Sequence, residues 1–305
     1  MQTTFTQALQ WLATRAAVLG SLLCVGAVAS AAGTLDKIKD TGKLTLGYSA
    51  DARPFSYTDA GKPAGYGIEL CNKVADALKS DLKLGALAVE FVPLSRDEAF
   101  RAIEQGRADV LCGAVPTLER RKTVDFSIPI ILSGTGVAIR SDAPMRLVQA
   151  LSGVESALPI WRGSTDQAPQ RVVLAVVGGA PLEKALASRL KERRIVADVT
   201  SVKDVDAGLQ ALRAGTAQAF FFDRALLLDA VARQPAGELV VLDRIYRREI
   251  VALAMRRDDD DLRLAVDRAL SQLYRSQQVN AIYAKYFGAP TAGVLDFFQL
   301  VALPD

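Results

Sequence analysis

The side chains that could do chemistry in this 305-residue chain are its acids, its arginines and three cysteines, because the sequence contains no histidine. Histidine is the commonest general base at neutral pH and the commonest metal ligand, so a histidine-based catalytic triad is excluded. Three cysteines at distant positions do not supply a zinc site either. We therefore expect no metal, no cofactor and no histidine-dependent catalysis.

One acid follows a very apolar segment. Residues Ala219–Phe222 (AFFF) read as a buried strand, and Asp223 comes directly after them. Open α/β sheets bind their ligands at the carboxyl ends of the strands, so Asp223 is a candidate ligand-binding acid. Aspartate also suits the N-cap of the helix expected at Arg224–Ala232, and one side chain can serve both roles.

A run of four aspartates, Asp258–Asp261, has two interpretations. The simpler one is a helix start, because carboxylates complement the free N–H groups of a first turn and an apolar stripe follows. The alternative is a divalent-ion site, although four consecutive side chains cannot all face one ion. We expect the helix start.

The first part of the chain beyond residue 34 alternates between strand and helix. The hydrophobic pattern predicts a helical stripe from Ile68 to Leu78 and a second helix that starts after Ser95, with Glu98 as its capping-box partner, and stops at Gly106. The predicted strands are Leu44–Tyr48, Val89–Val92 and Val110–Cys112. This alternation favours a mostly parallel sheet with helices on both faces.

A second α/β unit lies between two extended segments, Gly134–Ile139 and Ile250–Met255. Its predicted elements are strands at Val172–Val177, near Ile195–Val199, at Ala219–Phe222 and at Leu239–Leu242, with helices at Pro181–Arg193, near Val205–Ala214 and at Arg224–Ala232. Two extended crossings make a hinge, and a cleft between two such lobes can hold a ligand. We place lobe 1 at residues 34–137 plus 246–305 and lobe 2 at 138–245. The loosely patterned segment 141–170 has no predicted role.

Residues 1–31 have the plan of a secretory signal peptide. Arg15 precedes an apolar run, Ala16–Val28, and small residues follow, so cleavage is expected after Ala29 or Ala31. The run is short for a transmembrane span, and an uncleaved N-terminal anchor is the alternative. We expect a periplasmic protein.

Export would leave two cysteines, Cys71 and Cys112, in an oxidising compartment. They could form a disulfide, or they could be two small buried apolar residues. The sequence leaves both interpretations open.

The charges are nearly balanced, with 37 basic and 34 acidic residues and a net charge of +3. The arginine pairs are scattered along the chain, whereas a nucleic-acid binder concentrates its basic residues on one face or segment. We therefore expect no nucleic-acid partner.

Four blocks of the sequence, in order, resemble the signatures of the family 3 extracellular solute-binding proteins. They are Pro54–Tyr57 with Gly65–Leu70, Gly106–Asp109 with Thr117–Arg120 and Val124–Ser127, Ala219–Asp223, and Ile282–Gly288. The resemblance covers roughly residues 34–290, and it is greatest to the glutamate/aspartate-binding branch. Gly67 departs from the signature, which usually has an acidic residue at this position.

The resemblance implies an α/β protein with the two-lobed periplasmic binding protein fold of type II, each lobe a mostly parallel sheet flanked by helices. It also implies a monomeric receptor rather than an enzyme. Such a receptor binds a small amino-acid-like ligand and delivers it to the membrane permease of an ABC uptake transporter.

The resemblance further implies a set of ligand-binding residues. Arg120 matches the arginine that pairs with the ligand α-carboxylate, for which the guanidinium fork is well shaped. Asp223 matches the acid that accepts the α-ammonium group. Gly113, Val115 and Ala180 occupy the bend and the helix start that bind ligand in relatives, but this chain lacks the usual hydroxyl groups there. For Arg120, the alternative is a surface arginine that closes a turn.

Three further residues are candidates for the ligand side-chain pocket. Arg53 and Arg96 are expected to face it, since Ala52 and Arg96 replace the aromatic residues of cationic-amino-acid binders. Two positive charges would favour an acidic or carboxylated ligand, although both arginines could instead be rim residues. Phe55 could touch ligand, but an aromatic residue at such a turn more often packs.

The competing interpretation is an enzyme on the same scaffold, since a fold does not determine a function. Dehydratases of cyclic carboxylic acids are similar in sequence and need an acid or base in the cleft. Glu183 and Lys184 are the candidates for that role, and helix patterning explains both residues adequately.

Overall fold

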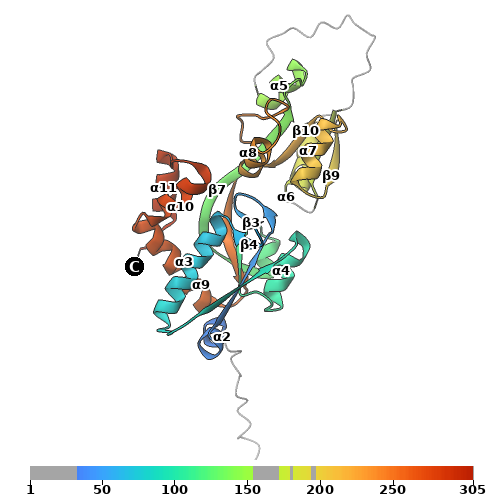
Figure 1. Ribbon diagram of the computed structural model, residues 1–305. Helices are drawn as coiled ribbons and strands as arrows, with labels where there is room; N and C mark the ends of the chain where they lie inside the picture. The colour runs from blue at the N-terminus through green and yellow to red at the C-terminus, as the bar shows by residue number, and fades with distance from the viewer. Residues whose placement is uncertain (1–32, 154–171, 179–180, 194–196, 305) are drawn as a thin grey trace, which may run out of the picture. The chain divides into compact units, whose positions relative to one another are not determined.

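The computed structural model describes residues 33–153, 172–178, 181–193 and 197–304 (Figure 1). The predicted signal peptide, its cleavage sites and Ala180 lie outside these residues. Residues 34–305 form one compact unit. None of the helices in the described part of the chain has both the length and the apolar character needed to cross a membrane.

A single mixed sheet runs through the described chain, in the order β5-β1-β6-β12-β7-β10-β8-β9, with β11 paired to β7. Its strands are β1 Lys43–Tyr48, β5 Ala88–Pro93, β6 Val110–Ala114, β7 Val124–Arg140, β8 Val172–Val177, β9 Ala197–Val202, β10 Ala219–Asp223, β11 Leu239–Val241 and β12 Arg247–Arg256. The strands within each outer group of three, β5-β1-β6 and β10-β8-β9, are parallel. The α/β alternation predicted for both halves is confirmed, and antiparallel pairs join the two parallel parts.

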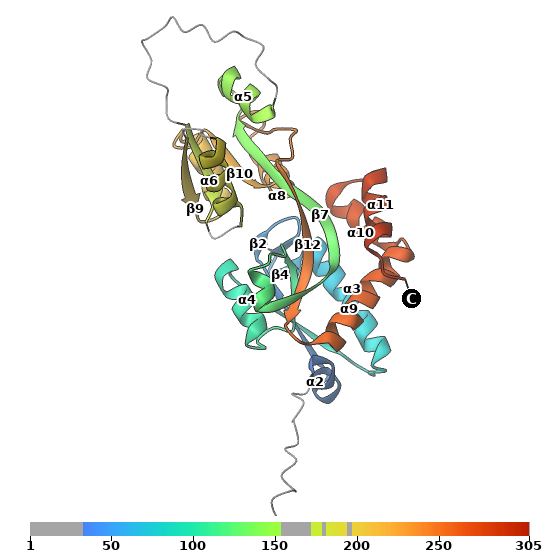
Figure 2. The same cartoon turned by 180° about the vertical axis from the view of Figure 1, so that it is seen from behind.

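The two long strands β7 and β12 are the extended crossings that the sequence indicated (Figure 2). They pair antiparallel from Arg247 opposite Thr135 to Arg256 opposite Val124. Strand β7 begins at Val124, ten residues before the predicted Gly134. The sequence pattern did not reveal this first half of the strand because Pro129 interrupts its apolar run. Pro129 lies where the pairing with β12 shifts register, a position at which a strand tolerates a residue without an N–H group. The predicted lobe boundaries within 137–138 and 245–246 stay a prediction.

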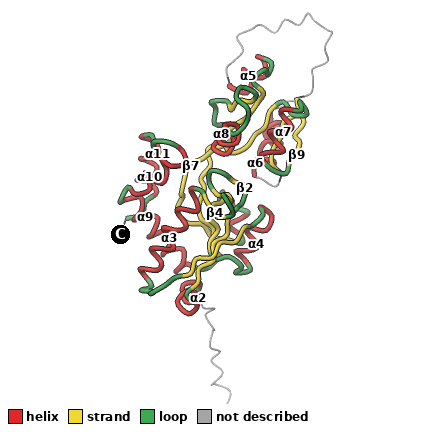
Figure 3. The backbone as a smooth tube through the Cα atoms, in the orientation of Figure 1, coloured by secondary structure: helices red, strands yellow, loops and turns green. Residues whose placement is uncertain are grey.

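Helices cover both faces of the sheet (Figure 3). Within the residues predicted as lobe 1, the helices are α2 Thr34–Thr41, α3 Tyr66–Asp81, α4 Arg96–Glu104, α9 Asp260–Arg275, α10 Gln278–Phe287 and α11 Ala292–Val301. Within those predicted as lobe 2, they are α5 Met145–Ser152, α6 Pro181–Arg193, α7 Val205–Arg213 and α8 Arg224–Ala232. Helices α3 and α9 lie on one side of β7 and β12, and α4 lies on the other, as Figures 1 and 2 both show.

The buried residues of the central strands alternate between the two faces, as strand geometry requires. Val110 and Cys112 of β6 pack in the core under α3 and α9, whereas Leu111 packs in a separate core with α4. Phe220 and Phe222 of β10 likewise belong to one core, and Phe221 to another. A strand buried on both faces reads as a continuous apolar run, which explains why these strands were predictable.

A disulfide between Cys71 and Cys112 joins α3 to β6 and settles the open question about these cysteines. The backbones are close at this point, because a side chain at Gly67 would clash with the carbonyl oxygen of Cys112. This close approach requires glycine, and it explains why Gly67 departs from the family signature.

Two predicted helix starts are present, with different contacts from those expected. Helix α9 begins at Asp260, but the buried Asp259 does not cap it and instead accepts hydrogen bonds from Thr34 N (3.1 Å) and Thr34 Oγ1 (2.5 Å). At α4, Ser95 is the N-cap and Glu98 is its partner, as predicted, but Ser95 Oγ donates to Glu98 Oε2 (2.7 Å) rather than accepting from a backbone N–H. The exposed Ser95 hydroxyl donates to Glu98 because a charged carboxylate is a strong hydrogen-bond acceptor.

A small three-stranded sheet lies beside the main one. Its strands are β2 Asp51–Ala52, β3 Ser56–Asp59 and β4 Lys62–Ala64, in the order β2-β3-β4. The turn between β2 and β3 carries Arg53 and Phe55, so this sheet positions two of the predicted site residues.

Candidate functional site

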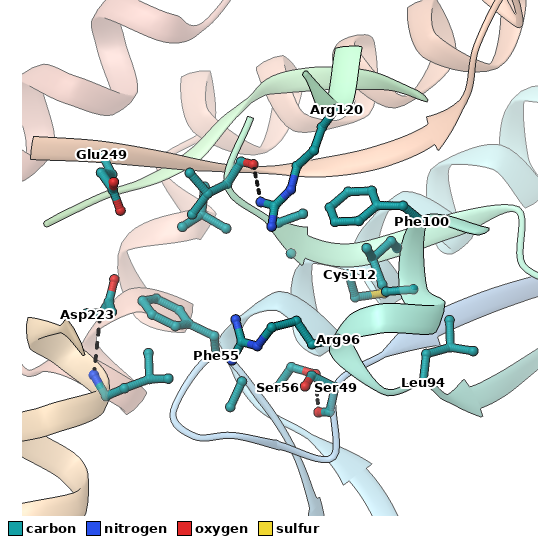
Figure 4. A pocket seen from close by; sticks show the side chains of 18 of the residues that line it. Ser49, Phe55, Ser56, Leu94, Arg96, Phe100, Cys112, Arg120, Asp223 and Glu249 are labelled. Atoms are coloured by element: carbon teal, nitrogen blue, oxygen red, sulfur yellow. Dashed lines mark hydrogen bonds between the residues drawn. The ribbon is translucent and has the colours of Figure 1, made fainter. Parts of the chain in front are cut away.

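A cavity of about 180 Å³ lies where β6, β10 and β12 meet α4 and the turn after β2 (Figure 4). Strand β6 contributes the segment beyond Cys112, and β10 contributes its last residues. Its lining residues are Ser49, Ala52, Phe55, Ser56, Leu94, Ser95, Arg96, Ala99, Phe100, Leu111, Cys112, Gly113, Ala114, Val115, Arg120, Thr135, Leu182, Phe222, Asp223, Leu226, Glu249 and Val251. The carboxyl ends of strands thus meet at this cavity, as the position of Asp223 predicted.

The charged groups of the cavity are divided between two sides. Figure 4 shows the side chains of Arg120 and Arg96 on one side and the carboxylates of Asp223 and Glu249 on the other. A ligand that fills the space between them meets cations at one end and anions at the other. The arrangement suits a zwitterion.

Arg120 begins a short 3-10 turn, Arg120–Lys122, and points its side chain into the cavity. Its Nη1 donates to the carbonyl oxygen of Val115 (2.7 Å), and its guanidinium lies 4.5 Å from the centre of the Phe100 ring. The turn itself is closed by a hydrogen bond from the Arg120 N–H to Thr117 Oγ1 (3.1 Å). The side chain is therefore not needed to close the turn.

The Arg120 guanidinium is a partly dehydrated cation. Burial is the main cause that lowers its pKa, the neighbouring Arg96 lowers it further, and Glu249 opposes both. A guanidinium remains charged under all physiological conditions. A bound carboxylate would complete the shell of acceptors that water provides elsewhere.

Asp223 ends β10 and caps α8, so both roles predicted for it depend on one position. Its Oδ1 accepts from the N–H groups of Ala225 (2.9 Å) and Leu226 (3.3 Å), and its Oδ2 accepts from Ser133 Oγ. Burial raises the pKa of Asp223 to about 6; the hydrogen bonds oppose this rise, and Glu249 adds to it. The N-cap is confirmed, and the contact with ligand stays a prediction.

The bend after β6 brings two more predicted residues to the cavity. Gly113 has a φ of 126°, which favours glycine, and the bend lets Val115 turn its carbonyl oxygen to Arg120. Phe55 also lines the cavity, but it is 8% exposed and its ring packs 5.5 Å from that of Phe287. Phe55 therefore both lines the cavity and packs in the core.

Arg53 and Arg96 have different environments. Arg96 lines the cavity, and its guanidinium lies 5.6 Å from the centre of the Phe222 ring. Arg53 is not among the residues that line this cavity; its guanidinium lies 4.3 Å from the centre of the Tyr57 ring, and its Nε lies 3.3 Å from Asp229 Oδ1. The cavity therefore gains one of the two expected positive charges, because the other is paired outside it.

Sequence reasoning missed Glu249, which lines the cavity from β12. The available signal was a single acid just before the apolar run Ile250–Met255. This signal was weak because the pairing of β12 with β7, which is remote in sequence, decides which face of β12 meets the cavity. Phe100, Phe222 and Thr135 also line the cavity and were not predicted as ligand contacts.

The two residues considered for an enzymatic role are not among those that line the cavity. Their neighbour Leu182 does line it, but Glu183 accepts a hydrogen bond from Ser201 Oγ and Lys184 is exposed. Within the described residues there is no group of three His, Cys, Asp or Glu side chains that could hold a metal ion.

The sequence matches the family model of the bacterial extracellular solute-binding proteins, family 3, over residues 44–289. The chain belongs to this family. The match covers both parallel parts of the sheet and both crossing strands, so the two-lobed fold expected from the resemblance is confirmed. In this solute-binding protein, the cavity has the Arg120 guanidinium on one side and the Asp223 carboxylate on the other.

Several relatives are similar over most of their length. The chain is 31% identical to the L-glutamate/L-aspartate-binding protein of Pseudomonas aeruginosa over 279 residues, 90% of this chain and 86% of the relative. It is 28% identical to the glutamate/aspartate import solute-binding protein of Salmonella typhimurium, covering 86% of this chain and 82% of the relative.

Solved structures of binding proteins have the same fold. One is an ancestral amino-acid-binding protein described as a precursor of cyclohexadienyl dehydratase, with a TM-score of 0.66 and 26% identity over 84% of this chain and 100% of that chain. Another is a mutant of ArgBP from T. maritima, with a TM-score of 0.64 and 24% identity over 83% of this chain and 98% of that chain. The second likeness concerns the fold alone.

Proposed function

We propose that this solute-binding protein is the substrate receptor of an amino-acid ABC uptake transporter and that it holds an acidic amino acid between Arg120 and Asp223. The observation that carries the proposal is the placement of a guanidinium and a carboxylate on opposite sides of one cavity. Relatives named as glutamate- and aspartate-binding proteins support it. Its partner is the membrane permease of the transporter.

The chemistry of the cavity matches an α-amino acid. The Arg120 guanidinium can form two parallel hydrogen bonds with the α-carboxylate, and the Asp223 carboxylate can accept from the α-ammonium group. Arg96 then supplies a second cation for a side-chain carboxylate. The Arg96 guanidinium lies over the ring of Phe222, a contact that favours a cation at this position.

Ligand capture follows a shift between conformations of the two lobes. The crossing strands β7 and β12 carry both Ser133, which holds Asp223, and Glu249. A ligand bridging residues of both lobes favours the closed form, and its differential affinity sets the size of the shift. The closed form is the one that the permease recognises in this proposal.

The remaining parts of the proposal concern the mature protein. The N-terminal signal peptide directs export to the periplasm and is removed, and the mature chain acts as a monomer. Mass spectrometry of the exported protein would identify cleavage after Ala29 or Ala31, and light scattering would give the oligomeric state.

The experiment that tests the proposal is a thermal-shift screen of the mature chain with amino acids, dicarboxylates, keto acids and cyclic carboxylic acids, followed by calorimetry. A micromolar ligand at millimolar concentration should stabilise the protein by about 4 kcal/mol. We expect a shift with glutamate or aspartate that is lost in Arg120→Ala and Asp223→Asn. The neighbouring exposed Arg121→Ala serves as the matched control and should bind normally.

Two results would overturn the proposal. One is the absence of any shift with amino acids. The other is a shift with a cyclic carboxylic acid that the protein then consumes, which would favour the enzyme interpretation.

A further inference from the structure

Glu249 lies at the point where the acid side of the cavity meets the crossing strands. It is opposite Ser133 in the pairing of β12 with β7, and Ser133 is the residue whose hydroxyl donates to Asp223. Asp223 itself is opposite Thr135, two residues further along β7. Three neighbouring strands thus bring two carboxylates to one end of the cavity.

The Glu249 carboxylate is poorly satisfied for a buried group. Its side chain is 13% exposed, and its buried Oε1 accepts no hydrogen bond from the described part of the chain. The neighbouring cation is Arg247, whose Nε lies 3.4 Å from Oε1 and whose side chain is 49% exposed. A carboxylate oxygen that is removed from water without a donor destabilises the ligand-free protein.

Asp223 has the opposite condition, because most of its capacity to accept is used. An ionised carboxylate has about four lone-pair positions, and two backbone N–H groups and the Ser133 hydroxyl occupy three of those on Asp223. An ammonium group has three N–H donors. Asp223 alone cannot satisfy it, and the Glu249 carboxylate lies on the same side of the cavity (Figure 4).

The electrostatic influence of Glu249 also extends across this space. Its negative charge opposes the fall in the pKa of Arg120 and contributes to the rise in the pKa of Asp223. Two carboxylates that face each other repel unless a cation lies between them. A cation between the two carboxylates would relieve the repulsion.

We propose that Glu249 is a specificity-determining residue whose carboxylate accepts a hydrogen bond from the ligand's ammonium group beside Asp223. The site thereby selects amino acids over carboxylic acids of the same length that lack the amine. This inference rests on the proposed function, since it concerns the same cavity, and it adds a second acid to the ammonium end. Arg247 pairs with Glu249 but is not among the residues that line the cavity.

The test compares ligand pairs rather than single affinities. The probe pair is glutamate and glutarate, which differ only in the amine, with aspartate and succinate as the second pair. Calorimetry on the wild type and on Glu249→Gln gives the ratio of affinities within each pair. The matched control is Glu90→Gln. Glu90 is an exposed acid on β5 that pairs with Lys43 of β1 and is not among the residues that line the cavity.

We expect Glu249→Gln to weaken the amino acid roughly 10- to 100-fold and to leave the dicarboxylate within about threefold, because only the amine loses a charged acceptor. Glu90→Gln should change neither affinity. A merely structural effect of Glu249, for example on the hinge strands, would weaken both members of a pair equally and would overturn the proposal. Unchanged binding of the amino acid by Glu249→Gln would also overturn it.

The two proposals fail in different ways. If Arg120→Ala and Asp223→Asn abolish amino-acid binding while Glu249→Gln does not, the role of Glu249 is wrong and the proposed function stands. If the wild type binds no amino acid, both are wrong. Arg247→Gln provides a further check, because the amino-acid preference should persist in it.

Discussion

Arg53 and Asp229 form an ion pair that joins the turn after β2 to helix α8, with 3.3 Å between Arg53 Nε and Asp229 Oδ1. Asp229 also pairs with Arg233 of its own helix, at 3.0 Å. Each end of the Arg53–Asp229 pair is on an element that carries a cavity residue, Phe55 on the turn and Asp223 at the start of α8. The contact therefore joins two elements that line the cavity.

We predict that Arg53→Ala weakens ligand binding only modestly and without changing ligand preference. The Arg53 side chain is 42% exposed, and solvent-screened pairs contribute little, so a loss of roughly two- to fivefold is expected. Calorimetry at low and high salt checks this, since the wild type should lose more affinity with salt than the variant, which no longer has the exposed ion pair. Arg233→Ala is the control, because it removes only the contact within α8.

The outcome of that experiment also decides where Arg53 acts. If Arg53→Ala instead abolished the preference for glutamate over glutamine, Arg53 would contact the ligand side chain, as the sequence suggested, and the ion pair would have to break on binding.

Neither Arg96 nor Arg120 has a carboxylate partner among the described residues, and we predict that Arg96 sets the preference for an acidic side chain. Arg96→Gln should reduce the affinity for glutamate roughly 10-fold or more while glutamine loses little, because a charged hydrogen bond is replaced by a neutral one. Binding constants for the two amino acids provide the measurement. Arg101→Gln, on the same helix but absent from the cavity lining, is the control.

Affinity should depend on pH through Asp223. Burial raises the pKa of this acid to about 6, so the ligand-free protein takes up a proton as the pH falls through that value. An ammonium group must displace this proton, and affinity should be roughly fourfold weaker at about pH 5.5 than at about pH 7.5. Asp223→Asn should have a weak and pH-independent affinity, and a wild-type affinity that stayed constant over this range would contradict the prediction.

The raised pKa of Asp223 also makes the stability of the ligand-free protein depend on pH. Stability should fall as the pH rises, whereas ligand affinity should increase. A carboxyl whose folded pKa is raised stabilises the protein below its unfolded pKa, and this contribution is lost as the pH rises through about 6. The ionised, ligand-free Asp223 then costs on the order of 3 kcal/mol at neutral pH. Melting curves without ligand should show Asp223→Asn gaining relative stability as the pH increases from 5 to 7.

The disulfide between Cys71 and Cys112 should contribute strongly to stability, because it closes a loop with a sequence separation of 41 residues. The chain-entropy model gives about 4 kcal/mol for such a loop. Reduction should lower the Tm by roughly 8 °C or more. The variant Cys71→Ser should melt at the reduced value with or without reductant, and an unchanged Tm on reduction of the wild type would refute the expectation.

The sequence alone determined the order and type of most elements. The bounds of β8 and α8 agree with the prediction residue for residue, because a strand buried on both faces is a continuous apolar run and a helix after Asp223 has a clear start. These are local patterns, and the physics that produces them is local. Arg120 and Asp223 could be predicted from the sequence for another reason: each lies inside a block that resembles the family.

Tertiary structure decided what depends on partners remote in the chain. Glu249 faces the cavity only because β12 pairs with β7 in one register, and a shift by one residue would turn it to the other face. Arg53 leaves the cavity because Asp229, 176 positions away, offers it a carboxylate. The disulfide likewise required α3 to meet β6, since two cysteines show no preference for each other until the fold brings them together.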